Sequence, residues 1–294
     1  MTLTILVTGA TGFLGSHLVK AFLVQGHRVV ILKRSFSKTN RINDVLSQCD
    51  IYDIDQCQLT RPFEEISSID ALVHVATCYG RNKEDAGTIF KINTEYPLKL
   101  LEIASKFEVK LFLNTGTVLN PHLNAYALSK SHFVDWGRQF SKQAKIKFIN
   151  LKLEHFFGAG DDNSKFVTHV IRSCLRNMPT LKLTAGEQRR DFIYVDDVVT
   201  AYQLLLKKIS GLSDTFQEYT VGSGKAVTIR NLVEKIHSLA ESQTVLEFGA
   251  VSYREGEVMF SEANIDDLLV LGWRPQFTLE KALTKTIVQE KEDS

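Results

Sequence analysis

The stretch Thr8-Gly9-Ala10-Thr11-Gly12-Phe13-Leu14-Gly15 decides how the rest of the chain is interpreted. It follows a continuous run of β-branched and apolar residues over positions 4–8, which predicts a buried strand. An amphipathic stretch with helical spacing follows over positions 14–25 and ends at Gly26. A glycine-rich turn between a strand and a helix is typical of dinucleotide-binding sites, although such turns also occur where nothing binds.

Each glycine of this turn has a separate physical task in a dinucleotide site. Gly9 permits the tight turn, Gly12 lets the backbone approach a pyrophosphate, and Gly15 lets the helix pack closely on the strand. The helix N-terminus then offers N–H groups and the positive end of its dipole to the phosphates. The cofactor contacts expected from this turn are Gly9, Thr11, Gly12, Phe13 and Leu14.

Short apolar runs alternate with amphipathic stretches along the first half of the chain. Further strands are expected over residues 28–33, 50–54, 71–76, 110–115 and 147–153, and helices over residues 37–47, 85–106 and 124–143. Alternating strands and helices favour right-handed crossovers and a parallel sheet that is covered on both faces. The sequence therefore predicts an α/β fold with a doubly wound, Rossmann-like parallel sheet.

After residue 157 turn-rich segments separate shorter elements, which indicates a smaller C-terminal lobe for the substrate. Helices are expected there over residues 166–177, 197–208, 229–240 and 279–290. We expect residues 1–157 to form the cofactor-binding domain and residues 158–294 the substrate lobe. Parts of the chain around residues 191–210 are expected to pack back on the first domain.

The composition excludes several classes of protein. The chain has 294 residues, with 35 Lys and Arg against 34 Asp and Glu, so it lacks the excess of cations typical of nucleic-acid binders. No apolar run approaches the roughly 18 residues of a membrane helix, and no basic segment precedes the first apolar run. The eight histidines and four cysteines show no metal-binding spacing. We therefore expect a cytoplasmic protein without a metal, a nucleic-acid partner or a membrane partner.

The end of the second predicted strand bears on the choice between NAD and NADP. An acidic residue there would bind the ribose 2′-hydroxyl of NAD, whereas cations would accommodate the 2′-phosphate of NADP. The strand runs into Lys33-Arg34-Ser35, and no acidic residue follows before Asp44. This favours NADP, although a Lys-Arg pair is also common on solvated surfaces. At the end of the third strand, Asp53 and Ile54 are candidates for adenine contact or plain strand-end residues.

Tyr126 and Lys130 lie four residues apart on a predicted helix, and therefore on one face of it. A free tyrosine has a pKa of about 10, and a neighbouring ammonium favours the phenolate. The pair is thus a plausible proton donor and acceptor. Taken alone the spacing is a weak signal, but Thr115 ends the preceding predicted strand and the glycine turn lies upstream.

Together these motifs resemble the extended short-chain dehydrogenase/reductases that act on nucleotide sugars, over nearly the whole chain. The similar segments are, in order, the glycine turn, His74-Val75-Ala76, Asn93, Thr115, Tyr126 with Lys130, Phe157-Gly158-Ala159-Gly160, residues 188–192 with 195–197, and Arg254-Glu255-Gly256-Glu257. Their number and order carry the resemblance, since none of them is decisive alone.

The resemblance implies roles for individual residues. Thr115 would hydrogen-bond the reacting sugar oxygen, Tyr126 would act as general acid/base, and Lys130 would bind the nicotinamide ribose and lower the Tyr126 pKa. Arg190 and Arg254 would hold the nucleotide diphosphate, which asks for cations that stay charged, unless they form only surface salt bridges. Further expected contacts are Ala76 and Asn93 with the cofactor, and Tyr79, Arg81, Thr117, Asn163, Lys165 and Phe166 with the substrate.

Within this family the chain favours a reductase. The family's dehydratases have Asp-Glu directly after the catalytic Thr, and this chain has Gly116-Thr117 at that place. In addition, Lys33-Arg34-Ser35 suits an enzyme that consumes NADPH. Residues 151–167 and 186–202 resemble 4-reductases that finish CDP-linked dideoxysugars, of the CDP-abequose synthase type. Lys152 and His155 replace the family's usual Arg and Asn, so the resemblance leaves the sugar and its stereochemistry open.

The implied reaction is the NADPH-dependent reduction of the C4 ketone of a nucleotide-linked 4-keto-6-deoxyhexose or 3,6-dideoxyhexose, with CDP favoured, in deoxysugar and O-antigen biosynthesis. An epimerase that keeps NAD bound is the first alternative, and a non-catalytic regulator that senses NADP(H) is the second. The resemblance also implies a homodimer through the helix that bears Tyr126 and Lys130. Phe133, Val134 and Trp136 suit that interface and equally suit core packing.

Overall fold

The computed structural model describes residues 2–143, 146–209, 211 and 215–292. The chain forms two compact units. The first unit consists of Met1–Lys152 and Val199–Tyr219, and the second of Leu153–Val198 and Thr220–Ser294. The expected division of function at residue 157 stays a prediction.

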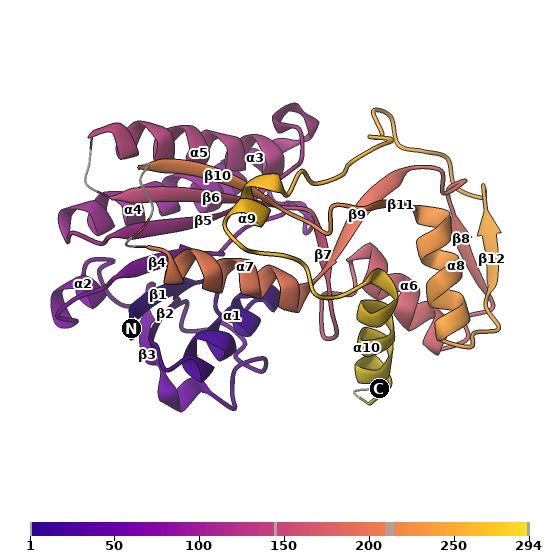
Figure 1. The fold of residues 1–294 in the computed structure, drawn as a ribbon, viewed down its shortest axis with the longest axis horizontal. Helices are drawn as coiled ribbons and strands as arrows, with labels where there is room; N and C mark the ends of the chain where they lie inside the picture. The colour runs from indigo at the N-terminus through magenta and orange to yellow at the C-terminus, as the bar shows by residue number, and fades with distance from the viewer. Residues whose placement is uncertain (1, 144–145, 210, 212–214, 293–294) are drawn as a thin grey trace. The chain divides into compact units, whose positions relative to one another are not determined.

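A seven-stranded sheet with the order β10-β6-β5-β4-β1-β2-β3 contains the strands of the first unit (Figure 1). The strands are β1 (Thr4–Thr8), β2 (Arg28–Lys33), β3 (Asp50–Asp53), β4 (Ala71–His74), β5 (Leu111–Thr117), β6 (Lys147–Leu153) and β10 (Phe216–Val221). β1 lies between β2 and β4, and both pairs are parallel. β2 with β3 and β4 with β5 are parallel as well. The predicted Rossmann-like α/β fold is confirmed, and the strand order reverses beside β1, where such sheets bind ligands.

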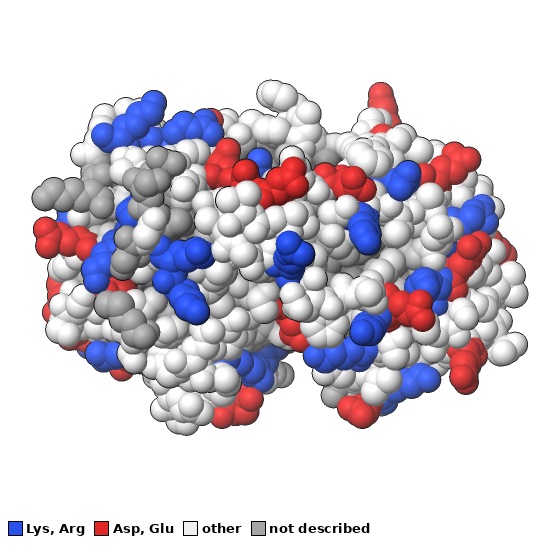
Figure 2. All heavy atoms as spheres, in the orientation of Figure 1, with Lys and Arg blue, Asp and Glu red and all other residues white. Residues whose placement is uncertain are grey.

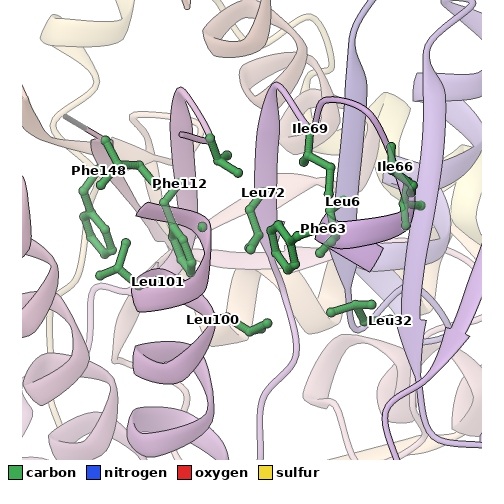
Figure 3. Close-up of a cluster of buried hydrophobic side chains, with 14 of the residues drawn as sticks. Leu6, Leu32, Phe63, Ile66, Ile69, Leu72, Leu100, Leu101, Phe112 and Phe148 are labelled. Atoms are coloured by element: carbon green, nitrogen blue, oxygen red, sulfur yellow. The ribbon is translucent and has the colours of Figure 1, made fainter. Parts of the chain in front are cut away.

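The core of the first unit follows from the two-residue period of its strands. On one face, Leu6, Leu72 and Phe112 point toward Leu100 and Leu101 of a helix (Figure 3). The alternate residues of the same strands point to the other face. They are equally buried, as Ile5, Val7, Val73 and Leu113 show. Both faces of the sheet are therefore covered, which explains why these strands read as continuous apolar runs.

The helices around this sheet are α1 (Phe13–Val24), α2 (Arg61–Glu65), α3 (Ala86–Phe90), α4 (Tyr96–Lys106), α5 (Ala125–Gln143) and α7 (Val195–Lys207). The helix expected over residues 85–106 exists, but its middle, η2 (Lys91–Glu95), is a π-helical turn. Pro97 gives a physical reason, because it has no N–H to offer the carbonyl four residues earlier, at Asn93. The turn also places Asn93 inside the protein.

The helix expected over residues 37–47 is wrong. This segment consists of turns that lead to the short 3₁₀ helix η1 (Leu46–Gln48). Ile42 is its only buried residue, so no apolar stripe holds a helix against the sheet. Ser, Asn and Asp side chains are frequent in the segment, and they favour turns over helix interiors.

In the second unit, β7 (His155–Phe157) pairs in parallel with β9 (Arg189–Tyr194), which pairs antiparallel with β11 (Ala226–Thr228). β8 (Thr180–Leu183) and β12 (Val245–Phe248) form a separate parallel pair. The remaining helices are α6 (Phe166–Leu175), α8 (Ile229–Leu239), α9 (Asp266–Val270) and α10 (Leu279–Glu292). The four helices expected in the C-terminal part of the chain are thus α6, α7, α8 and α10, with ends that differ by a few residues.

Charged side chains of both signs occur across the face shown in Figure 2. On this face the Lys and Arg side chains are interspersed with Asp and Glu side chains, so the face is not divided into a basic half and an acidic half. Among the described residues, no helix has the length and apolarity needed to cross a membrane.

Candidate functional site

The glycine turn between β1 and α1 is built from backbone packed against backbone. Gly9 has a φ of +69°, and a Cβ atom there would lie 2.6 Å from the backbone nitrogen of Ala76. A Cβ on Gly15 would overlap the carbonyl oxygen of Gly9. Gly12 is exposed, and helix α1 begins after it without a side-chain cap. A pyrophosphate site requires that the backbone N–H groups at the start of a helix are not covered by a side chain at the N-cap position, and Gly12 meets this requirement.

Thr8 joins this turn to the end of β4. Its hydroxyl oxygen accepts hydrogen bonds from the backbone N–H groups of Val75 (3.2 Å) and Ala76 (3.3 Å). The hydroxyl oxygen also lies within hydrogen-bond distance of Nδ1 of His74, at 2.8 Å. His74 is fully buried, and burial and the charge of Lys130 both hold its pKa well below the usual range. A neutral His74 therefore helps to hold Ala76, an expected cofactor contact, beside the turn.

At the ends of β2 and β3, Lys33 and Ser35 contact acidic residues that lie about 20 positions further along the sequence. Lys33 Nζ lies 2.5 Å from Asp53 Oδ1, because Lys33 and Asp53 are opposite each other in the two parallel strands. The backbone N–H and the hydroxyl of Ser35 both donate to Asp55. Two of the three groups expected to bind a 2′-phosphate are thus already engaged with carboxylates.

Arg34 differs from its neighbours. It is exposed, its guanidinium lies 4.8 Å from the centre of the Phe36 ring, and no described carboxylate contacts it. Ile54, another expected contact, donates its N–H to the carbonyl of Lys33. Arg34 is therefore the cation of this cluster that remains available to a phosphate.

Thr115, Tyr126 and Lys130 all lie in the first unit, Thr115 on β5 and the other two on α5. Helix α5 begins at Ala125, and the side chain of Asn124 accepts from the N–H of Ala127, which accounts for a helix start just before Tyr126. Tyr126 and Lys130 follow one another on the same face of α5, as the spacing predicts.

Tyr126 keeps its proton at neutral pH. Burial and the neighbouring Tyr79, whose ring centre is 5.0 Å from that of Tyr126, raise the pKa of its phenol. A hydrogen bond with Thr117 and the charge of Arg81 lower the pKa, but they do not offset the effect of burial. The resemblance implied that Lys130 lowers this pKa, and Lys130 is not among the groups that shift it. The phenol is thus poised as a proton donor.

Tyr79 and Arg81 lie together after β4. The guanidinium of Arg81 is 4.8 Å from the centre of the Tyr79 ring, and both side chains are partly or fully exposed. The ring of Tyr79 also packs against that of Tyr126, with the two ring planes tilted by 33°. Two expected substrate contacts are therefore next to the expected proton donor.

Lys130 is buried, with 3% of its surface exposed. Burial alone lowers the pKa of its ammonium to about 8. Within the described part of the chain no carboxylate pairs with it, and the only charged effect involving it is on His74. A desolvated ammonium of this kind calls for polar acceptors, and ribose hydroxyls are of the right chemistry.

The side-chain amide of Asn93 is fully engaged in hydrogen bonds within the protein. Its carbonyl accepts from the hydroxyl of Thr77 and the N–H of Cys78, and its amide donates to the carbonyl of Cys78 and the hydroxyl of Ser129. Ser129 in turn donates to the carbonyl of Tyr126. Asn93 therefore connects the segment after β4 to helix α5, so its effect on a cofactor would be indirect.

Tyr202 was not among the residues expected from the sequence. It lies on α7, is fully buried, and its hydroxyl is 2.6 Å from that of Thr115. Tyr202 is the last residue of the segment 186–202, which carries part of the family resemblance. The sequence around it has the pattern of an apolar helix, and such a pattern does not indicate a polar contact.

In the second unit, Arg190 pairs with Glu257 at 2.7 Å, and 10% of its side chain is exposed. Both residues belong to segments that carry the family resemblance. The sequence therefore singles out each segment, but it does not predict that the two side chains form an ion pair. Arg254 is exposed. The other expected substrate contacts, Asn163, Lys165 and Phe166, lie together at the start of α6, where Lys165 precedes the first helical residue.

The buried ammonium of Lys130 predicts a particular pH dependence of stability. Its pKa is 10.5 in the reference state and about 8 in the folded chain, so the folded chain binds fewer protons between these values. Stability therefore rises with pH across this window. We expect Lys130→Met to be more stable than the wild type at neutral pH, by an amount on the order of 3 kcal/mol. This advantage should shrink as the pH rises from about 8 toward 10.5.

The measurement is urea unfolding of both proteins over that pH range, since titrations common to both cancel in the difference. Lys130→Arg, which stays charged throughout, serves as the matched control, because the difference in unfolding free energy between it and the Met variant should not change with pH. A difference between the Met variant and the wild type that is constant with pH would contradict this account of Lys130.

Comparisons with known proteins bear on the family to which the chain belongs. Residues 5–222 match the model of the NAD dependent epimerase/dehydratase family. The chain is 34% identical over 291 residues to CDP-abequose synthase of Salmonella muenchen, covering 96% of each chain. It is also 34% identical over 294 residues to CDP-abequose synthase of Salmonella typhimurium, covering 96% of this chain and 97% of that one.

Among solved structures, UDP-glucose 4-epimerase of Thermotoga maritima, in complex with UDP-glucose, has a TM-score of 0.87 and 23% identity over 99% of both chains. At this identity the likeness shows the fold alone. The family match covers most of the chain, and the two synthases match it over nearly its whole length. The chain therefore belongs to the NAD-dependent epimerase/dehydratase family of nucleotide-sugar enzymes.

Proposed function

We propose that this protein uses NADPH to reduce the C4 ketone of a nucleotide-linked 4-keto-6-deoxyhexose, or of its 3,6-dideoxy form, with a CDP-linked sugar favoured. The observation that carries the proposal is the half-buried Tyr126, whose phenol pKa is raised, one helical turn from an ammonium that has no carboxylate partner among the described residues. The full-length similarity to two CDP-abequose synthases supports the choice of sugar class. The product would enter deoxysugar and O-antigen biosynthesis.

The residues of the first unit fit NADPH. Gly9, Gly12 and Gly15 place no side chain where the backbone of the turn and the start of α1 would meet a pyrophosphate. Arg34 is the candidate for the 2′-phosphate, and Lys130 for the hydroxyls of the nicotinamide ribose. When bound there, NADPH supplies the hydride that reduces the ketone carbon. The protein itself has to orient the sugar and supply one proton.

The proton would come from Tyr126. As the ketone is reduced, negative charge develops on its oxygen, and a neutral phenol nearby can donate its proton to that oxygen. Thr115 would donate a hydrogen bond to the same oxygen, so that two donors stabilise the developing alkoxide. A raised phenol pKa suits this direction of reaction, because the acid must be protonated before each turnover.

Dehydration is disfavoured by the residue that follows Thr115. Gly116 has no side chain, and a Cβ at this position would overlap the side chain of Asn150. An acidic residue therefore has no room there, quite apart from its absence in the sequence. No carboxyl group directly follows Thr115 to eliminate water from the sugar.

In the second unit, Arg190 and Arg254 would hold the nucleotide diphosphate. Arg190 is mostly buried, and Glu257 fixes one end of its guanidinium. Nη1 of Arg190 also donates to the backbone carbonyl of Arg189, so the guanidinium is held in one orientation from which its further N–H groups could donate to a phosphate. Asn163, Lys165 and Phe166 would add contacts from the start of α6.

A second candidate function is epimerisation with bound NAD. One observation favours it: Asp53 and Asp55 stand beside Lys33 and Ser35, so acidic groups are available near an adenosine ribose. Arg34, without such a partner among the described residues, favours the reductase.

An NADPH-oxidation assay over CDP-, dTDP-, GDP- and UDP-linked 4-ketosugars tests the proposal. We expect NADPH consumption that is fastest with a CDP-linked 4-keto-6-deoxyhexose or its 3,6-dideoxy form. Tyr126→Phe should lower kcat by about 100-fold or more, because general acid catalysis contributes factors of that size. NADPH affinity, measured by fluorescence titration, should stay within about twofold of the wild type.

Two outcomes would count against the proposal. A purified protein that carries tightly bound cofactor and interconverts nucleotide sugars without consuming NADPH is an epimerase. Turnover by Tyr126→Phe at the wild-type rate would remove Tyr126 from the mechanism.

The cofactor preference is tested on Arg34 alone. Arg34→Ala should weaken NADPH binding by about tenfold, because a charge-assisted contact to phosphate contributes about 1.4 kcal/mol. NADH binding should not change, since NADH has no 2′-phosphate. Titrating both cofactors against Arg34→Ala, and against Lys38→Ala as a control for the loss of a nearby exposed cation, separates the contact from general charge effects. An equal loss for both cofactors would contradict the assignment.

A further inference from the structure

The hydroxyl groups of Tyr202 and Thr115 form a short hydrogen bond, with 2.6 Å between the two oxygen atoms. Tyr202 is completely buried, whereas Thr115 is only partly buried. Both belong to the first unit. The function proposed above gives no role to Tyr202, although it touches one of the two groups expected to contact the reacting oxygen.

The direction of this hydrogen bond follows from what surrounds the phenol. Each hydroxyl has one proton, so either group can be the donor. Thr115 is the only hydrogen-bond partner that the described residues offer to the Tyr202 hydroxyl. If Thr115 donated, the phenol proton would be buried without an acceptor, which costs about 1–3 kcal/mol. Tyr202 is therefore the donor and Thr115 the acceptor.

This direction leaves the proton of Thr115 available for another acceptor. The phenol also stays neutral, because burial raises its pKa and no cation contacts its hydroxyl. A hydroxyl that accepts one hydrogen bond becomes a stronger donor in the next, since neighbouring hydrogen bonds polarise one another. Thr115 thus has a defined proton direction before any substrate arrives.

We propose that Tyr202 is a positioning residue that orients the hydroxyl of Thr115 as a donor to the reacting sugar oxygen. The proposal rests on the proposed function in one respect, namely that Thr115 faces this oxygen. Its effect should grow as negative charge develops on the oxygen, and should therefore appear in kcat more than in the KM for the sugar.

A double-mutant cycle between the two residues tests the proposal. Tyr202→Phe keeps the ring and removes only the hydroxyl, and Thr115→Val keeps the shape of the threonine without its hydroxyl. In the wild-type background, Tyr202→Phe should lower kcat for ketosugar reduction about tenfold, which corresponds to one hydrogen bond, with the KM within about twofold. In the Thr115→Val background, the same change should alter kcat less than about twofold.

Tyr194→Phe is the matched control. Tyr194 is another buried tyrosine, at the end of β9, and has no assigned role at the site. Its variant should keep kcat within about twofold of the wild type. Urea unfolding of every variant separates a loss of stability from an effect on the reaction, because a merely structural role would lower the free energy of unfolding without changing kcat selectively.

Equal effects of Tyr202→Phe in both backgrounds would overturn the proposal, and so would a wild-type kcat in the single variant. A wild type that interconverts sugar epimers instead of reducing ketosugars would refute the proposed function. The same cycle is then measured on epimerisation, which also moves a proton at the sugar oxygen. The two hypotheses can therefore fail independently.

Discussion

Backbone atoms approach so closely at the first turn of the chain that two positions cannot carry a side chain. A Cβ on Gly15 would overlap the carbonyl oxygen of Gly9, and one on Gly9 would come within 2.6 Å of the backbone of Ala76. This close approach brings together the end of β1, the start of α1 and the residues after β4. It leaves the helix N-terminus facing solvent without a side-chain cap, so that phosphates can reach it. The packing of the cofactor turn against α1 and against the residues after β4 thus depends on the absence of side chains at these two positions.

Burial of titratable groups around this turn determines the proposed chemistry. Thr8 and a neutral His74 hold the backbone after β4. Lys130 is desolvated beside His74, and the burial that lowers the pKa of the ammonium also raises the pKa of Tyr126. A desolvated ammonium that lacks hydrogen-bond acceptors among the described residues is suited to binding the hydroxyls of a ribose. A phenol that keeps its proton is suited to protonating an alkoxide. Neither group needs a carboxylate to set its state, which distinguishes this site from an acid–base pair of carboxyl groups.

Much of the fold could be predicted because its signals are local. The strands β1, β2 and β6 have the predicted bounds, since short, mainly apolar runs between turn residues leave little choice. The helix expected over residues 37–47 failed because helical propensity without an apolar stripe does not hold a segment against a sheet. The candidate site divides in the same way. The glycine turn and the Tyr126–Lys130 spacing are local patterns, whereas the Lys33–Asp53 pair depends on strand register. The contact between Tyr202 and Thr115 joins residues 87 positions apart, and no local pattern encodes it.

Transfer of hydrogen from the cofactor to the C4 carbon of the sugar is the central claim, and isotopic labelling tests it most directly. The protein would be incubated with a CDP-linked 4-keto-6-deoxyhexose and NADPH that carries deuterium at the transferable position of its nicotinamide ring. We expect one deuterium per product molecule, located at C4 of the reduced sugar by NMR spectroscopy and mass spectrometry. A product without deuterium, or a sugar epimer formed while the labelled NADPH remains unconsumed, would contradict the proposed reduction.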